Sequence, residues 1–132
     1  MDKRLKTEQR INLIDMAVHN FRKMEIWKKA MDLTKTVYLM LPNIPTDEKF
    51  GLKSQVSRSA VSVASNIAEG SGRSTDKDFS NFLSISLGSC YELETQLILI
   101  QDIFQIDCEK IIVDCQQVQK MIVGFKNNLI NH

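Results

Sequence analysis

The sequence predicts an all-α protein, an antiparallel up-down-up-down four-helix bundle with a short N-terminal extension. Helix breakers are rare: the 132 residues include only five Gly and two Pro, and both Pro lie in the segment LPNIP. Apolar residues recur at spacings of three and four along four long segments, which is the period of a helix and not of a strand. The connections between these segments are short, which favours antiparallel neighbours.

The composition is typical of a soluble protein with one core, because 43% of the residues are hydrophobic and 25% are charged. We expect residues 1–20 to form the extension and residues 21–132 the bundle domain. No segment approaches the roughly 20 apolar residues of a membrane span, and the N-terminus lacks the apolar core of a secretory signal. Three cysteines without a close-spaced pair favour reduced thiols. We therefore expect a cytoplasmic protein.

Within the extension, apolar residues at helical spacing predict a short amphipathic helix over residues 8–18. A helix of about three turns is marginal alone, so it needs a surface on its own bundle or on a neighbouring subunit. The first long helix is predicted over residues 24–40 and ends before Pro42 and Pro45. Its apolar stripe consists of Ile26, Ala30, Leu33 and Val37.

The second helix is predicted to begin near Thr46, whose hydroxyl can cap it, and to end at Gly70. Its apolar seam is Leu52, Val56, Ala60, Val63 and Ile67. A second, polar stripe runs along it at the same spacing: Gln55, Arg58, Ser62, Asn66 and Glu69. Between Gln55 and Gly70 the helix has no broad charged face to offer to water. Such a helix is normally covered on most sides, which predicts an assembly larger than one thin bundle.

The third helix is predicted to start with Thr75 as its cap and to run about thirty residues to Phe104. Its main seam has strict 4-3 spacing: Phe79, Leu83, Ser86, Cys90, Leu93, Leu97, Ile100 and Phe104. A second stripe runs beside it: Phe82, Ile85, Ser89, Glu92, Gln96, Leu99 and Ile103. Two adjacent seams imply two partners. The fourth helix is predicted to begin near Asp107, with a seam made of Ile111, Cys115, Val118, Ile122, Phe125 and Leu129.

The polar residues of the second and third helices can form one connected network. Its predicted members are Gln55, Arg58, Ser62, Asn66, Glu69, Ser89, Glu92 and Gln96. Burying Arg58 or Glu92 alone would cost several kcal/mol, so each needs a partner. The network either sets register and oligomeric state or lines a groove that binds a ligand. We favour the structural role, because hydroxyls and one ion pair make a poor binding site.

Basic residues concentrate near the N-terminus, where residues 1–35 hold nine Lys or Arg against five Asp or Glu, although the whole chain carries only +1. The candidate nucleic-acid contacts are Arg22, Lys23, Lys28, Lys29 and Lys35, with Lys3, Arg4, Lys6 and Arg10 as possible additions. The alternative is an ordinary solvated helix face, since Glu25 and Asp32 interrupt the run. Affinity that falls steeply with salt would distinguish a phosphate-binding surface from a solvated face.

The sequence offers little for catalysis. His19 and His132 belong to no Ser-His-Asp, Cys-His or Glu-x-x-His pattern, which excludes the di-iron site that some four-helix bundles carry. The GSGRS turn resembles a phosphate cradle, but a helix-to-helix turn needs the same glycines and no P-loop lysine is present. We expect no enzyme activity, no cofactor, no metal and no small-molecule substrate.

Several motifs together resemble a known family. They are Trp27-x2-Ala30-Met31-x-Leu33, Leu41-Pro42, Phe50-Gly51-Leu52, the run from Gln55 to Gly70 with its NIAEG ending, and Gly88-Ser89-x2-Glu92-Leu93. They resemble the bacterial four-helix-bundle proteins encoded by intervening sequences in large-subunit ribosomal RNA genes. The resemblance covers about Phe21 to Leu129 and implies a homopentamer whose subunits pack side by side around a central channel.

The chain is also similar to the accessory proteins of diversity-generating retroelements, which form such a barrel and work with a reverse transcriptase and nucleic acid. Those proteins are strongly basic, whereas this chain is nearly neutral, and residues 1–20 lie outside the resemblance. We expect a non-enzymatic homopentameric scaffold that binds RNA or a nucleic-acid-handling protein. The alternative is a protein-protein interaction module with no nucleic-acid role, in which the helix at residues 8–18 docks on a partner.

Overall fold

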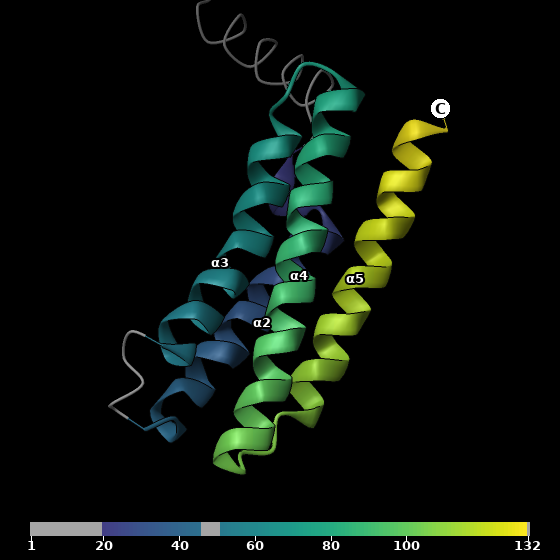
Figure 1. Cartoon of the computed structure of the whole chain (residues 1–132). Coiled ribbons are helices and arrows are strands. Elements are labelled where there is room, and N and C mark those ends of the chain that lie inside the picture. The colour runs from purple at the N-terminus through teal and green to yellow at the C-terminus, as the bar shows by residue number, and fades with distance from the viewer. Residues whose placement is uncertain (1–19, 46–50, 132) are drawn as a thin grey trace, which may run out of the picture.

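The protein is a bundle of four long helices, as the sequence predicts (Figure 1). The computed structural model describes residues 20–45 and 51–131. The helices are α2 (Glu25–Met40), α3 (Leu52–Ser71), α4 (Asp76–Phe104) and α5 (Glu109–Ile130), with short 3₁₀ helices η1 (Phe21–Lys23) and η2 (Leu41–Asn43) on either side of α2. Consecutive helices run in opposite directions, and α5 also packs against α2. Within the described ranges, no helix is both long and apolar enough to cross a membrane.

The core consists of the seams that the helical period predicts. The predicted seam residues that are buried are Ile26, Ala30, Leu33 and Val37 of α2, Val56, Ala60, Val63 and Ile67 of α3, Phe79, Leu83, Ser86, Cys90, Leu93, Leu97 and Ile100 of α4, and Ile111, Cys115, Val118 and Ile122 of α5. Aligned seams of this kind bury apolar area along the whole length of each helix, which is the main force that holds a bundle together.

Two helix starts differ from the prediction. Helix α3 begins at Leu52, because Gly51 before it has a non-helical backbone with φ −101° and ψ −127°. Thr46 is therefore not its cap, and Thr46 itself lies outside the described residues. Helix α5 begins at Glu109, with Cys108 as the N-cap residue. Asp107 still stabilises this start, since its Oδ1 accepts a hydrogen bond from the Glu109 N–H at 3.0 Å.

Other helix ends follow the prediction. Thr75 caps α4, because its hydroxyl oxygen accepts a hydrogen bond from the Asp78 N–H at 3.1 Å. Helix α2 ends at Met40, and Pro42 lies in the 3₁₀ turn that follows it. The predicted helix over residues 8–18 lies outside the described residues.

Helices α3 and α4 lie unusually close together. Gly70 of α3 is buried, and a Cβ atom added to it would stand only 2.6 Å from Cβ of Phe82. Further along, the Ser86 hydroxyl donates a hydrogen bond of 2.7 Å to the Val63 carbonyl across the two helices. Small and hydroxylic side chains permit this approach, which fixes the register of α3 against α4 and positions the residues described next.

Candidate functional site

Three of the predicted network residues meet where α3 and α4 face each other. The hydroxyl oxygens of Ser62 and Ser89 are 2.8 Å apart and share a hydrogen bond. Asn66 adds its side-chain amide, which donates to the Ser62 carbonyl at 2.8 Å and to the Ser62 hydroxyl at 2.9 Å. This part of the network is a satisfied polar cluster that joins the two helices. Such a cluster favours one register, because a shift would leave buried hydroxyls without partners.

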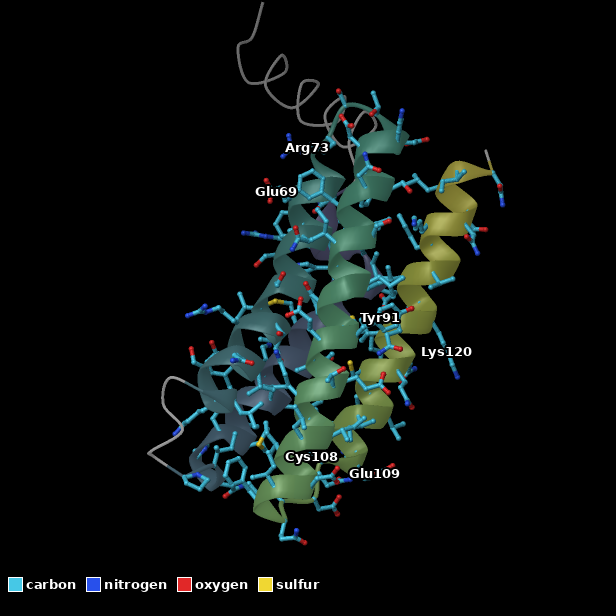
Figure 2. All side chains as sticks on the ribbon, in the orientation of Figure 1. Glu69, Arg73, Tyr91, Cys108, Glu109 and Lys120 are labelled. Atoms are coloured by element: carbon cyan, nitrogen blue, oxygen red, sulfur yellow. The ribbon has the colours of Figure 1, made fainter. Side chains whose placement is uncertain are left out.

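Glu69 was predicted as a member of the network, but its partner is a residue outside that network. Arg73, in the turn after α3, donates a hydrogen bond to its carboxylate at 3.0 Å, and both side chains remain partly exposed. Figure 2 shows the two residues close together at this end of the bundle. The guanidinium carbon of Arg73 also lies 4.5 Å from the centre of the Phe82 ring. Sequence reasoning missed Arg73, although its i+4 spacing from Glu69 was a signal.

Gln96 lies at the opposite end of the predicted network. Its side chain is almost fully buried, with 8% exposure, and its Oε1 atom accepts no hydrogen bond within the described part of the chain. Gln55 on α3 is exposed instead. The network therefore does not extend continuously along the two helices. It consists of a central hydroxyl cluster, an ion pair at one end, and a glutamine with an unpaired carbonyl at the other.

Arg58 and Glu92 are both exposed, and no ion pair joins them. They lie at the same level, because α3 and α4 are antiparallel and the bonded pair Ser62 and Ser89 is about one turn away from both. The expectation that they are buried and paired is not met. Their side chains reach solvent, so neither incurs a desolvation cost that a partner must offset.

An apolar stripe accompanies Glu92 on the outer side of α4. Ile85 is 52% exposed, Leu99 is 41% exposed and Ile103 is 57% exposed. These residues are spaced from Glu92 by seven, seven and eleven positions, so all lie on nearly the same line along the helix. Three partly exposed apolar side chains therefore share one face of α4. We call this surface, with Arg58 and Glu92 at its centre, the α3–α4 outer face.

The five candidate basic contacts are all exposed but do not form one patch. Arg22 and Lys23 lie in η1, and Lys28 pairs with Glu25 at 3.4 Å. Lys35 lies two turns beyond Lys28 along α2, and Lys29 is turned toward α5. Lys3, Arg4, Lys6 and Arg10 lie outside the described residues.

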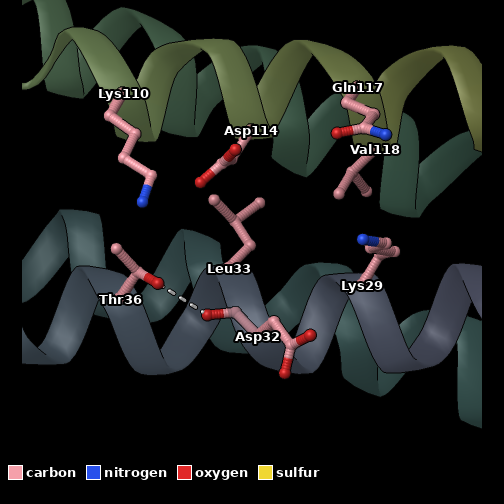
Figure 3. A pocket seen from close by; sticks show the side chains of 8 residues that line it. All are labelled: Lys29, Asp32, Leu33, Thr36, Lys110, Asp114, Gln117 and Val118. Carbon is pink, nitrogen blue, oxygen red and sulfur yellow. Dashed lines mark hydrogen bonds between the residues drawn. The ribbon is translucent and has the colours of Figure 1, made fainter.

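Lys29 lines a hollow between α2 and α5. The hollow has a volume of about 240 Å³ and a floor made of Leu33 and Val118. Figure 3 shows Lys29 extending from α2 toward α5, while Lys110 and Asp114 extend from α5 toward α2. Asp32 completes a set of two cations and two anions around this hollow. Because the charges balance, the hollow has no net attraction for a polyanion.

The cysteines lie inside the bundle, as predicted. Cys90, Cys108 and Cys115 are free and buried. A hydrogen bond with Cys115 and burial raise the pKa of the Cys90 thiol, and burial next to Asp107 raises the pKa of the Cys108 thiol. A raised pKa keeps the Cys90 and Cys108 thiols protonated and unreactive, so these two residues act as small core side chains. The same hydrogen bond with Cys90 lowers the pKa of the Cys115 thiol.

A second outer face lies between α4 and α5. Glu94 of α4 is half-buried and accepts hydrogen bonds from Gln119 at 2.7 Å and Gln116 at 3.1 Å. Tyr91 and Ile98, one turn on either side of Glu94, are exposed. On α5, Val123 and Ile130 continue the line of the two glutamines and are also exposed. We call this surface the α4–α5 outer face. Sequence reasoning missed Glu94, because its amide partners come from another helix.

Comparisons with known proteins agree with the architecture. The sequence profile of the family described as 23S rRNA-intervening sequence protein matches residues 22–124. A solved structure from Bacteroides thetaiotaomicron, described as a protein with unknown function from the S23 ribosomal protein family, superposes with a TM-score of 0.71 at 24% identity. It covers 76% of this chain and 97% of its own length, and its likeness supports the fold. No curated protein matches. The family profile spans most of the bundle, and the chain therefore belongs to the 23S rRNA-intervening sequence protein family.

Proposed function

We propose that this protein is a homo-oligomeric scaffold, a ring of five subunits packed side by side, and that the assembled ring binds RNA. The observation that carries the assembly is the α3–α4 outer face, where Ile85, Leu99 and Ile103 are exposed on one line. Around 25 cal/mol is gained for each Å² of apolar surface removed from water, so a second subunit is a favourable cover for this stripe. The number five comes from the resemblance to pentameric barrel proteins.

Binding energy at this face has a polar component as well. Arg58 and Glu92 offer both signs of charge at its centre, and charged groups at an interface favour one register over others. In such a ring, another copy of the chain covers the outer side of α3. The helix is then covered on most sides, as its composition between Gln55 and Gly70 predicts. The protein has a binding role in this proposal and not a catalytic one.

The assembly is tested by light scattering on the purified protein at micromolar concentration. We expect a mass of about five subunits for the wild type and a smaller species for Leu99→Glu, which places a charge in the apolar stripe. Leu39→Glu is the matched control, since Leu39 on α2 is 80% exposed and lies away from this face. Circular dichroism should show the same helix content for all three proteins. A monomeric wild type would overturn the assembly.

The RNA part rests on the basic residues of η1 and α2 and on the family's association with ribosomal RNA genes. Arg22, Lys23 and Lys35 are exposed and have no acidic partner among the described residues. Exposed cations bind phosphates through counterion release, so the affinity depends strongly on salt. A ring multiplies these contacts, because several weak sites act on one strand.

A salt titration with a fluorescent large-subunit ribosomal RNA fragment tests this part. We expect binding at about 50 mM salt that weakens steeply toward 200 mM, and weaker binding by a Lys23→Glu/Lys35→Glu variant. Lys110→Glu at the start of α5 is the control for a charge change outside η1 and outside both outer faces. An intact oligomer that binds no RNA at low salt would refute RNA binding. That result would favour the alternative, a protein-protein interaction module. Its partner could then be a nucleic-acid-handling protein or another protein.

A further inference from the structure

We propose that the two outer faces meet in the ring: the α3–α4 outer face of one subunit packs against the α4–α5 outer face of the next. In this arrangement Arg58 pairs with Glu94 of the neighbouring subunit. The inference rests on the proposed assembly and specifies its interface.

A closed ring requires two different faces on each subunit, because every subunit contacts one neighbour on each side. In a ring of five, the directions to the two neighbours differ by about 108°. The outer faces of a four-helix bundle that share one helix point about 90° apart, whereas opposite faces point about 180° apart. The partner of the α3–α4 outer face should therefore be one of the two faces next to it.

Charge selects between these two faces. Arg58 has no acidic partner among the described residues of its own subunit. Glu94 accepts hydrogen bonds only from two neutral amides, so its charge is not balanced by a cation within the described ranges. On the other neighbouring face, between α2 and α3, helical spacing places Trp27, Met31, Thr34 and Tyr38 beside Ser57, Val61 and Ala68, none of which is acidic. Arg58 thus finds an anion on the α4–α5 outer face and not on the α2–α3 side.

The heights of the residues along the bundle also match. A rotation about an axis parallel to the helices leaves every residue at its own level. Arg58 lies level with about residue 93 of α4, because Ser62 is bonded to Ser89 across the antiparallel pair, so Glu94 is within about one residue of the same height. Leu99 and Ile98 are consecutive residues and hence also at nearly one level.

The opposite end of the interface matches too. On α5, Gln116 and Gln119 lie level with Glu94, because both donate hydrogen bonds to it. Val123 lies further along α5, toward the end of the bundle where α4 starts. A rise of about 1.5 Å per residue places it within about one helical turn of the level of Ile85. The predicted contacts are therefore apolar, charged and apolar in order: Ile85 with Val123, Arg58 with Glu94, and Leu99 with Ile98. Exposed apolar side chains would be covered at both ends of the central ion pair.

Charge reversal tests the central pair by light scattering over a dilution series. Arg58→Glu and Glu94→Arg should each place like charges together and make the ring dissociate at about tenfold higher protein concentration or more. The double variant Arg58→Glu/Glu94→Arg should restore assembly, because every interface regains an opposite pair. Glu94→Gln, which keeps the amide contacts nearly in place, should weaken the ring less than Glu94→Arg. Glu109→Arg, at an exposed position on the start of α5, is the control.

Disulfide trapping tests which faces meet. A chain with both Ile98→Cys and Leu99→Cys should form, under mild oxidation, a ladder of covalent oligomers on a non-reducing gel. Each single variant should stay uncrosslinked, since residue 98 meets residue 99 of the neighbour and not its own copy. Dimers from Leu99→Cys alone would show a two-fold interface and overturn the inference. An intact wild-type oligomer with no ladder and no rescue would refute this interface only, whereas a monomeric wild type would refute the proposed assembly itself.

Discussion

At the scale of single residues, the size of one side chain sets how closely α3 and α4 pack. Gly70 is buried against α4, and a Cβ atom at this position would lie nearest to atoms of Phe82 and Phe79. The hydroxyl cluster of Ser62 and Ser89 forms further along the same contact. Close packing at Gly70 and polar pairing at the serines therefore specify the same register.

Gly70→Ala should destabilise the fold by about 1–3 kcal/mol, because the added methyl group would stand 2.6 Å from Cβ of Phe82 and the helices would have to separate. Urea unfolding followed by circular dichroism measures this difference. Gly124→Ala is the control: nothing lies within 4 Å of a Cβ atom there, and alanine favours a helix by up to about 1 kcal/mol. Equal stability of the two variants would show that the close approach is not needed.

Arg58→Ala and Glu92→Ala should weaken assembly more than they change helix content. Both side chains are exposed in the single subunit, so their removal should alter its unfolding free energy by no more than about 0.5 kcal/mol. Light scattering and circular dichroism on the same samples separate the two effects. Variants that remain normal oligomers but lose RNA binding would identify this face as a ligand site and contradict our structural interpretation of the polar stripe.

At the scale of elements, α4 organises the molecule because it borders both outer faces. Its main seam is buried in the core, Ser89 and Gln96 are buried on the side of α3, and Glu94 bonds to α5. The main seam thus finds its partners inside the bundle, whereas only Ser89 and Gln96 of the second predicted stripe are buried. Ile85, Leu99 and Ile103 remain exposed, which is why a further contact is proposed there.

Thr75→Ala should cost about 1 kcal/mol, because the start of α4 would lose the oxygen that accepts from the Asp78 N–H. Thr95→Ala is a matched control within the same helix. The Thr95 hydroxyl only donates to the Tyr91 carbonyl of its own preceding turn, so its removal should be neutral or slightly stabilising. Thermal unfolding of the two variants side by side measures the difference. A Thr75→Ala variant as stable as wild type would show that this cap is not important.

At the scale of the whole molecule, the buried thiols couple the stability of the bundle to pH. Burial raises the pKa of Cys108 above its ordinary value of 9.0. The unfolded chain therefore releases this proton at a lower pH than the folded one. The contribution of Cys108 is fully present below about pH 9 and is lost as the pH rises toward the folded-state pKa.

The free energy of unfolding should thus decline as the pH rises above about 9, as measured by urea titrations at each pH. A Cys108→Ala variant should show a shallower decline, because the thiol that binds a proton more tightly in the folded state is absent. An identical slope in both proteins would mean that the burial of Cys108 does not shift its titration.

The deletion of residues 1–20 addresses the whole assembly. If the extension serves an external partner, the oligomer should survive the deletion with its mass per subunit reduced accordingly. If the extension straps subunits together, light scattering should show dissociation at a higher protein concentration. Either result assigns a role to residues 1–20, which lie outside the residues that match the family profile.

The sequence by itself determined the four helices, their buried seams and the cap at Thr75. These features depend on the 3.6-residue period and on local hydrogen bonds, both of which can be followed along one chain. It also brought out Ser62 and Ser89 as facing residues, since stripes at equal spacing meet when two helices are antiparallel. The predicted start of α3 was wrong by several residues, because the non-helical backbone of Gly51 makes the helix begin at Leu52.

Only the tertiary structure decided which polar residues meet. Arg58 and Glu92 lie level with each other yet reach solvent, Glu69 binds Arg73, Glu94 binds two amides of α5, and Lys29 turns toward the hollow beside α5. The helical period gives the direction in which a side chain leaves its own helix. Whether that direction ends in solvent or on a partner depends on the distance between helix axes, which small residues such as Gly70 set across the contact.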